Sequence, residues 1–434
     1  MNQDADLSPL TPAPRPAVPT DLRHIVYALS DALDLVGIDD IAHAKRVGIM
    51  AAECARVLGW DARRIDRIFD LGLLHDIGVS STATHRHLVS EFDWESSQDH
   101  CHIGHALLRD YPPLADLALP ILHHHTHWSA MPTDLPPEIA LTANLIYLVD
   151  RVDALSAPHH AAGTLLMHTR TIREAIVAYA AGRFAPELIE AFLAASQPEA
   201  FWLTLESRSI RVYLDEMLLH ATPHAVSRHD MKQLAAILSQ IVDAKSPFTA
   251  EHSQGVAALA RHLAERLAVP AENLDKLEIA GLLHDVGKLR VPDEILDKPG
   301  QLDHDERQVM NAHSFETYQI LRQIPGCEEI APWAAYHHEE PGGRGYPFHI
   351  DARSLPLEAR ILRVADIFQA MTQNRPYRRG LSAEAAGEFV RALAGEGRLD
   401  AHIVDTLLAD LPAALAAAHP GQRQPTSSPP ARPA

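Results

Sequence analysis

The chain is poor in cysteine, and its few cysteines are scattered. Cys54, Cys101 and Cys327 are the only three among 434 residues, and they form no CxxC pair. They therefore predict neither a disulfide framework nor a cysteine-based metal site. We expect core or near-surface thiols at all three positions. Cys101 lies among histidines and is a secondary candidate for an additional metal ligand.

Positive charge and long apolar runs are also scarce. The 38 Lys and Arg stand against 57 Asp and Glu, a formal net charge of −19, which excludes a long nucleic acid as partner. Charged residues or histidine interrupt every apolar stretch well before the ~18 residues of a membrane-spanning helix. The N-terminus has neither the basic start nor the apolar run of a signal peptide. We expect a cytoplasmic protein without a membrane partner.

Histidine, in contrast, is abundant, and it lies on helical stripes. Residues 1–20 and 419–434 are rich in Pro, Ser and Gln, which predicts disordered tails. Between them, helical periodicity is nearly continuous; one stripe combines His252 with Val256, Leu259 and Leu263. A histidine on a buried stripe must find a polar partner inside the protein. The pattern predicts an all-α fold with internal histidine sites.

An internal repeat organises these histidines. DLGLLHDIG and IAGLLHDVG are near copies, and seven His and Asp positions recur in the same order around them, displaced by 209 to 216 residues. The first copy contributes His43, His75, Asp76, His100, His124, His125 and Asp150, and the second contributes His252, His284, Asp285, His313, His337, His338 and Asp366. Most of the intervening sequence has drifted, so ligation explains the retained residues better than packing does. We predict two tandem helical-bundle domains, residues 21–218 and 224–418.

The ligand types indicate a pair of metal ions in the second copy. Two His and two Asp (His252, His284, Asp285, Asp366) can hold a first ion, while His313, His337 and His338 can hold a second one, with Asp285 as a bridge. Imidazole combined with carboxylate suits Fe or Mn, with Zn, Ni or Co as alternatives, better than Mg or Ca. Two ions about 3.5–4 Å apart can activate a water for in-line displacement at phosphorus. Lys288 could contact a phosphate oxygen there.

Several separated motifs of the second copy resemble one known family. LLHDVGKLRVPDEILDKPGQL, HHEE, GRGYP and VAD followed by NRPYR are similar to the HD-GYP subgroup of HD-domain metal-dependent phosphohydrolases over most of residues 245–385. This resemblance implies tandem HD-type helical bundles and a two- or three-metal centre, held by the seven residues above, that hydrolyses cyclic di-GMP. It implies phosphate contact by Lys288, a pocket shaped by Tyr346, and a grip on the substrate by Arg375 and Arg378. Asp285 and Lys288 become the predicted catalytic residues.

The sequence also departs from the family pattern. The leading Asp of the DGxGYP motif is Gly342, and the Asp common three residues after the last ligand is Gln369. Some members have a glutamate that binds a third metal ion. This chain has Phe248 at that position, which favours a site with two ions. The first copy keeps its ligand set but has Val79 at the lysine position and no GYP loop, so it resembles a divergent HD domain. Its predicted metal site could be catalytic, regulatory or structural.

These observations predict a phosphodiesterase that converts cyclic di-GMP to pGpG or GMP in bacterial signalling. One alternative is an HD-type hydrolase for another cyclic dinucleotide, such as cyclic GMP-AMP, or for another nucleotide. A second alternative is a non-catalytic nucleotide-binding module. The GYP loop makes a diguanylate cyclase (GGDEF) domain a candidate partner, and a homodimer is left open.

Overall fold

The computed structural model describes residues 20–37, 42–90, 97–245, 251–374 and 379–421. Helices account for the regular structure within these ranges, where the only β-type pairings are isolated bridges, Asp21 with Ala225 and Gly342 with Asp351. The predicted all-α class is therefore confirmed. The tails predicted to be disordered lie almost wholly outside the described residues.

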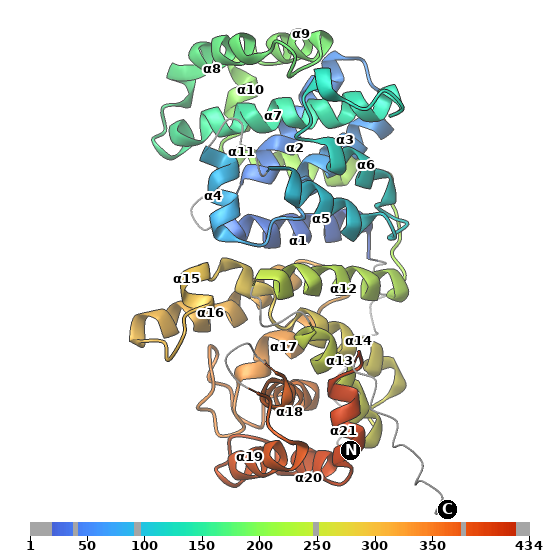
Figure 1. Cartoon of the computed structure of the whole chain (residues 1–434), viewed down its shortest axis with the longest axis vertical. Coiled ribbons are helices and arrows are strands. Elements are labelled where there is room, and N and C mark those ends of the chain that lie inside the picture. The colour runs from blue at the N-terminus through green and yellow to red at the C-terminus, as the bar shows by residue number, and fades with distance from the viewer. Residues whose placement is uncertain (1–19, 38–41, 91–96, 246–250, 375–378, 422–434) are drawn as a thin grey trace, which may run out of the picture.

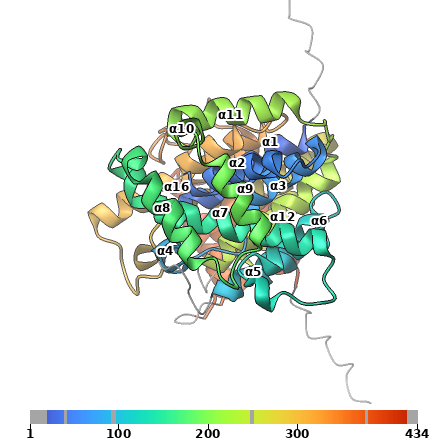
Figure 2. The same cartoon turned by 90° about the horizontal axis from the view of Figure 1, so that it is seen from above.

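The N-terminal half contains the first copy of the repeat. Its helices are α1 (Leu22–Asp34), α2 (His43–Val57), α3 (Ala62–Leu74), α4 (Thr82–Ser90), α5 (Gln98–Leu108), α6 (Ala115–His123), α7 (Pro137–Ala161), α8 (Leu165–Tyr179), α9 (Pro186–Ala195), α10 (Glu199–Thr204) and α11 (Ser207–His220), with short 3₁₀ helices η1 (Leu35–Gly37) and η3 (Trp128–Ala130). Helices α8 and α9 lie at the end of the molecule farthest from the C-terminal half (Figure 1, Figure 2).

The C-terminal half repeats the arrangement. Its helices are α12 (Arg228–Lys245), α13 (His252–Arg266), α14 (Ala271–Leu283), α15 (Asp293–Leu296), α16 (His304–Leu321), α17 (Ile330–Ala335), α18 (Leu357–Thr372), α19 (Ala383–Gly395), α20 (Ala401–Leu408) and α21 (Leu411–Ala418), with 3₁₀ helices η4 (Val286–Arg290) and η5 (Tyr336–His338). The predicted break at 222–223 falls in the non-helical stretch between α11 and α12. The precise domain limits stay a prediction.

Glycines at equivalent positions of the two copies, Gly72 with Gly281 and Gly78 with Gly287, let the ligand-bearing segments approach each other closely. A Cβ on Gly72 would lie 2.4 Å from the Cα of Gly48, and a Cβ on Gly281 would lie 2.7 Å from the Cα of Ala257. Helices α2 and α3, and likewise α13 and α14, can therefore cross at close range. A Cβ on Gly78 or on Gly287 would lie 2.0 Å from the carbonyl oxygen of the ligand-bearing His100 or His313. These glycines let the His-Asp turn touch the helix that supplies the next histidine.

The two halves are joined by a polar contact around a buried lysine. Lys245 Nζ, at the end of α12, lies 3.1 Å from Asp293 Oδ1 and donates to Thr82 Oγ1 (3.1 Å) and to the Ser80 carbonyl (3.3 Å). Asp293 Oδ2 in turn accepts from Ser81 Oγ (2.8 Å) and from the Ala83 N–H (3.2 Å) at the start of α4. η1 also packs on η4, the segment that carries Lys288.

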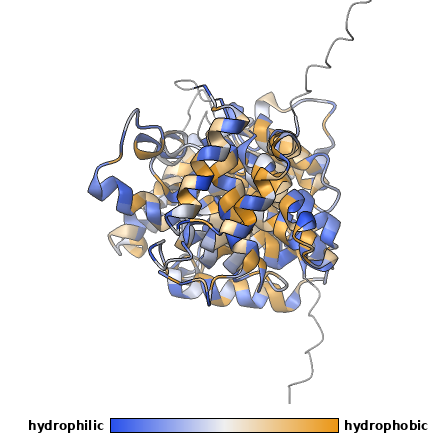
Figure 3. Cartoon of the chain, turned by 90° about the horizontal axis from the view of Figure 1, so that it is seen from below, coloured by the Kyte–Doolittle hydropathy of each residue, from blue (hydrophilic) through white to orange (hydrophobic). Residues whose placement is uncertain are grey.

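Apolar side chains fill the interior of both halves. Seen from the C-terminal end, the apolar residues concentrate between the helices and the polar ones on the outer surfaces (Figure 3). Among the described residues no single helix is long and apolar enough to cross a membrane; the bent pair α20–α21, with an angle of 97° between its members, is the one combination that passes by length and composition.

Candidate metal centre

The seven predicted ligands of the C-terminal half converge from five helical elements. His252 begins α13, His284 and Asp285 follow the last residue of α14, His313 lies in α16, His337 and His338 form η5, and Asp366 lies in α18. Their side chains gather into the C-terminal cage, which we define as His252, His284, Asp285, His313, His337, His338 and Asp366. The structure therefore brings together every ligand that the second copy predicts.

Asp285 lies between two groups of imidazoles. Its Oδ2 is 3.3 Å from His284 Nε2 and 3.8 Å from His252 Nε2, whereas its Oδ1 is 3.4 Å from His313 Nε2 and 3.7 Å from His337 Nε2. One carboxylate thus presents a different oxygen to each group, which is the arrangement of a bridging ligand. Asp366 joins the first group, with Oδ1 at 3.4 Å from His252 Nε2.

Hydrogen bonds behind the rings orient the histidines toward the cage. The Nδ1 atoms of His284, His313 and His337 donate to the carbonyls three residues earlier, at 2.8, 2.6 and 2.6 Å. An imidazole that donates through Nδ1 keeps the Nε2 lone pair for a metal. His252 Nδ1 is bonded instead to Gln369 Oε1 at 2.6 Å. The Asp common in the family would give His252 a charged hydrogen-bond acceptor, whereas Gln369 gives it a neutral one.

The donor set fits divalent cations. Ligand atoms lie within 4.8 Å of one another in three overlapping groups: His252 with His284 and Asp366, His284 with Asp285 and His337, and His313 with His337 and His338. His284 Nε2 and Asp285 Oδ1 are buried, and apart from the ion-pair contacts at 3.3 and 3.4 Å given above, the described residues offer neither atom a hydrogen bond of good geometry. Buried polar atoms without partners require an explanation. A metal ion, whose bonds to imidazole nitrogen are about 2.0–2.1 Å long, would satisfy both atoms.

The charges of the cage are strongly coupled. Burial opposes ionisation of Asp285, but His284 and Lys288 outweigh it and hold the pKa of this carboxyl well below its usual range. Burial likewise lowers the pKa of His284, and Asp285 and Asp366 outweigh that effect and raise the pKa to about 9. In the metal-free cage His284 therefore holds a proton, which a cation must displace in order to bind.

Lys288 and Tyr346 lie against the cage. The ammonium group of Lys288 contacts the Asp285 carboxylate, and its side chain is 22% exposed. The Tyr346 ring stacks on His338 with centroids 4.8 Å apart and planes at 29°. Tyr346 thus supports a predicted ligand directly. Arg375, Arg378 and Phe248 lie outside the described residues.

A glutamate to which the sequence assigned no role shapes the GYP loop. Glu339 is buried, and its carboxylate accepts from the N–H groups of Phe348 (2.6 Å), His349 (3.1 Å) and Ile350 (3.2 Å). This binding folds the segment after Tyr346 back onto η5, next to the ligand histidines. The signal was present in the repeat, because the first copy has Thr126 at this position and no GYP loop.

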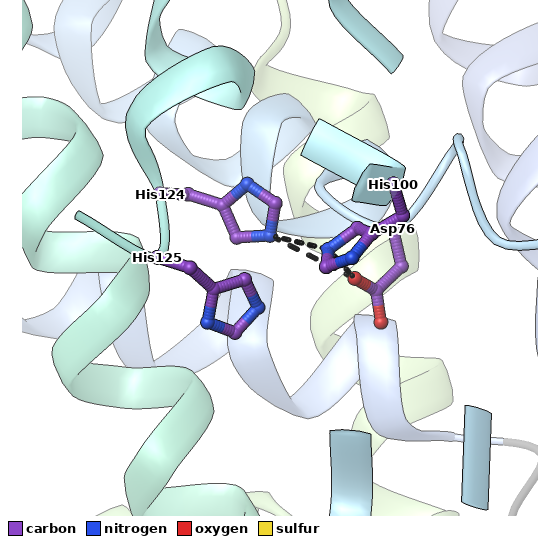
Figure 4. Close-up of side chains that lie close together, drawn as sticks. All are labelled: Asp76, His100, His124 and His125. Atoms are coloured by element: carbon purple, nitrogen blue, oxygen red, sulfur yellow. Dashed lines mark hydrogen bonds and ion pairs between the residues drawn. The ribbon is translucent and has the colours of Figure 1, made fainter. Parts of the chain in front are cut away.

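The first copy builds a second cage, the N-terminal cage, from His43, His75, Asp76, His100, His124, His125 and Asp150. Asp76 again lies between two groups, with Oδ2 at 3.5 Å from His75 Nε2 and Oδ1 at 3.2 Å from His100 Nε2. Asp76, His100, His124 and His125 have ligand atoms within 4.8 Å of one another, and their side chains face a common point (Figure 4). His43 Nδ1 bonds Asp153 Oδ2 at 2.8 Å, the counterpart of the His252–Gln369 bond.

Cys101 is buried behind this cage. Its Sγ lies 3.5 Å from His124 Nδ1 and 3.8 Å from His100 Nε2, and donates to the Ser97 carbonyl at 3.3 Å. Cys101 belongs to none of the ligand groups among the described residues. The thiol is therefore a core residue in contact with ligands, as the sequence favoured. Cys54 and Cys327 are buried as well.

Comparison with known proteins agrees with this geometry. HD-domain family models match residues 40–155 and 236–403, one in each half. A 3′3′-cGAMP-specific phosphodiesterase 1 of Vibrio cholerae is 35% identical over 404 residues, covering 89% of this chain and 91% of that protein. The chain belongs to the HD-GYP family of phosphodiesterases. This confirms the predicted resemblance and the reading of both halves as HD domains.

Other relatives of this HD-GYP protein match it over different lengths. The cyclic di-GMP phosphodiesterase response regulator RpfG of Xanthomonas campestris is 34% identical over 206 residues, 47% of this chain and 54% of that protein. A crystal structure of a cyclic GMP-AMP-specific phosphodiesterase of V. cholerae (V-cGAP3) has a TM-score of 0.63 at 23% identity, covering 92% of this chain and 98% of that one. The latter likeness shows that the fold is shared.

Proposed function

We propose that this HD-GYP protein hydrolyses a cyclic dinucleotide at the C-terminal cage, and that its substrate is 3′3′-cyclic GMP-AMP. The observation that carries the reaction is the bridging position of Asp285 between two histidine groups. When two divalent ions are bound there, they supply an activated water and clamp the attacking and leaving oxygens of an in-line displacement. We propose His252, His284, Asp285, His313, His337, His338 and Asp366 as their ligands.

The chain's own residues prepare this reaction. The backbone carbonyls behind His284, His313 and His337 hold each ring in the tautomer that a metal needs. Lys288, at the partly exposed edge of the cage, can leave Asp285 for a non-bridging phosphate oxygen and offset the charge that develops there. Arg375 and Arg378 remain predicted contacts to the phosphates or bases of the substrate.

The choice of cyclic GMP-AMP rests on the extent of the similarity. A relative that matches 89% of this chain is named for 3′3′-cGAMP, as are two that match 35% and 42%, whereas RpfG and PA4108, which are named for cyclic di-GMP, match 47% and 37%. The Gly342 and Gln369 departures from the family pattern favour a substrate other than cyclic di-GMP. Cyclic di-GMP, hydrolysed to pGpG or GMP, is the second candidate, because relatives named for cyclic di-GMP, RpfG among them, are 34–35% identical over 165 to 206 residues.

A competition assay tests the substrate. Full-length protein, purified anaerobically and loaded with Mn²⁺ or Fe²⁺, is given equimolar 3′3′-cyclic GMP-AMP and cyclic di-GMP, and products are separated by chromatography. We expect the mixed dinucleotide to be linearised at least tenfold faster. Faster linearisation of cyclic di-GMP would reverse the substrate order. Failure to open either ring would overturn the proposed hydrolysis.

The non-catalytic alternative has its own test. His284→Ala combined with Asp285→Ala removes one histidine of the first group and the carboxylate that lies between the two groups. If the protein acts by hydrolysis, the double variant loses its signalling effect in cells; a binding module would keep it. The diguanylate cyclase partner and the homodimer stay predictions, as does a cytoplasmic location.

A further inference from the structure

The two cages share their ligand types but differ at the residue after the last aspartate. Arg151 follows Asp150, whereas Ile367 follows Asp366. Arg151 Nη2 donates to Asp150 Oδ2 at 2.7 Å and to the Leu88 carbonyl at 3.0 Å, and the side chain is 2% exposed. A permanent positive charge is thus fixed on one of the predicted ligand carboxylates of the N-terminal cage.

Asp150 and Asp366 differ in what holds them. In the C-terminal cage Asp366 joins His252 and His284 in a three-residue group, whereas the N-terminal group contains His43, His75 and Asp76. Asp150 Oδ1 lies 3.6 Å from His43 Nε2, but its Oδ2 is held by Arg151. A guanidinium held at this position neutralises Asp150 and repels an incoming dication in surroundings of low dielectric constant. The position that corresponds to the first ion of the C-terminal cage is therefore disfavoured in the N-terminal half.

Lys288 does not block the C-terminal cage in the same way. It also contacts a ligand carboxylate, but its side chain is 22% exposed and lies at the edge of the cage. The flexible stem of a lysine lets the ammonium group move away when cations bind. Arg151 is buried, and the nitrogen that bonds Asp150 also bonds the Leu88 carbonyl. Movement of this nitrogen away from Asp150 would therefore break both hydrogen bonds.

The other ion position is complete in the N-terminal half. Asp76, His100, His124 and His125 form the largest ligand group of either cage, with three imidazoles and one carboxylate. Asp76 Oδ1 is buried and faces these histidines, at 3.2 Å from His100 Nε2 and 3.8 Å from His124 Nε2. His124 Nδ1 donates to the Ile121 carbonyl at 2.7 Å, which leaves its Nε2 for a metal.

We infer that the N-terminal cage is a mononuclear metal site, in which Asp76, His100, His124 and His125 hold a single divalent ion and the charge of Arg151 on Asp150 disfavours a second one. Three imidazoles and a carboxylate suit Zn²⁺, Mn²⁺, Fe²⁺, Ni²⁺ or Co²⁺. The site has Val79 where the C-terminal half has Lys288, and it lacks the second ion of a two-metal displacement. We therefore expect the bound ion to stabilise the fold or to regulate the protein, and not to catalyse hydrolysis.

Counting ions in full-length protein tests this inference. His284→Ala, Asp285→Ala and His337→Ala together remove a member of every ligand group of the C-terminal cage, and the protein is then loaded with Mn²⁺, passed through a desalting column and analysed for metal by mass spectrometry. We expect one Mn²⁺ per chain, with the six-line electron paramagnetic resonance spectrum of an isolated ion. Adding His124→Ala with His125→Ala removes it. Either no bound ion or two coupled ions in the first variant would overturn the inference.

A matched pair of single variants tests the same inference in a protein that keeps its C-terminal cage. Asp150→Asn and Asp366→Asn make the same change at equivalent positions of the two cages, and asparagine can still accept from Arg151. We expect Asp150→Asn to keep the wild-type metal count and Asp366→Asn to lower it; a lower count in Asp150→Asn would contradict the inference. The count does not depend on dinucleotide hydrolysis, so failure of the proposed function and failure of this inference are distinguishable.

Discussion

Replacing Glu339 by glutamine should loosen the GYP loop while leaving the ligand set unchanged. The carboxylate of Glu339 is buried and receives three backbone N–H groups, from Phe348 and His349 on Oε1 and from Ile350 on Oε2. Glutamine has the same size, but only one of its two terminal atoms can accept a hydrogen bond. Its amide nitrogen would face the N–H of Ile350, donor against donor.

The magnitude follows from the bonds that change. A hydrogen bond to a charged acceptor contributes about 1.5–3 kcal/mol and a neutral one about 0.5–1.5 kcal/mol. Losing one charged bond and weakening two others sums to about 3–5 kcal/mol, of which relaxation of the loop recovers a part. In a half of this size, 1 kcal/mol corresponds to roughly 2–4 °C, so we expect the melting transition of the C-terminal half to fall by about 5–12 °C.

Calorimetry of Glu339→Gln against Glu329→Gln provides the assay. Glu329 is exposed and pairs with Lys276, so its substitution should shift melting by less than about 2 °C. We expect turnover to fall in Glu339→Gln as well, because the loop that stacks Tyr346 on His338 is released. A melting shift within 1 °C of wild type would refute the reasoning that Glu339 organises the loop.

Three further predictions concern the C-terminal cage. Lys288→Ala should lower kcat by about 10²–10³ because a charge near the phosphate is lost, while metal content, measured by mass spectrometry, stays unchanged. Gln369→Ala removes the acceptor behind His252 and should weaken metal binding by about 10–100-fold in equilibrium dialysis. Because the raised pKa of His284, about 9, stabilises the metal-free fold below pH 6.5, the melting temperature of metal-free protein should fall between pH 6.5 and 9, whereas metal affinity should rise over the same range.

Each of these predictions has a result that contradicts it. Loss of metal together with activity in Lys288→Ala would make the lysine a support of the ligands instead of a phosphate contact. Unchanged affinity in Gln369→Ala would mean that His252 needs no orienting partner, and Asp153→Ala provides the matched comparison in the N-terminal half. A melting temperature of metal-free protein that rises from pH 6.5 to 9 would show that His284 is not protonated in that state.

The sequence predicted the fold class and both cages because their signals are periodic or repeated. Helical stripes identified the all-α architecture. The recurrence of His284 and Asp285 at a fixed displacement from His75 and Asp76 distinguished ligand histidines from the rest of the 28. A ligand must keep its chemical type while its neighbours change. A repeat within one chain therefore carries much of the information that an alignment would.

The supports of the cages could not be predicted in the same way. Gln369 meets His252 across 117 positions, and nothing in the spacing indicates that contact. In the N-terminal half the pair is Asp153 with His43, and Arg46 clamps Asp153 at 2.6 Å. Gly255 occupies the position equivalent to Arg46, where a Cβ would lie 3.0 Å from Gln369 Cγ. That Arg46 and Asp153 support His43, whereas the neutral Gln369 supports His252, becomes apparent only in the folded structure.

The contact between the halves was also invisible in the sequence. Lys245 lies at the end of an amphipathic helix and Asp293 in a polar turn, positions at which solvated charges are ordinary. The structure buries the lysine against Asp293 and the start of α4, close to the segment that carries Lys288. Such tertiary contacts depend on how two domains pack, which periodicity within each domain does not specify.

The most direct test of the central claim is a single-turnover assay of full-length protein loaded with Mn²⁺, in which bound metal and opened 3′3′-cyclic GMP-AMP are measured on the same sample, with His313→Ala as the comparison. The account predicts that wild-type protein linearises the dinucleotide and that His313→Ala loses both an ion and turnover. Hydrolysis that persists in His313→Ala at the wild-type rate would contradict the assignment of the C-terminal cage as the active site.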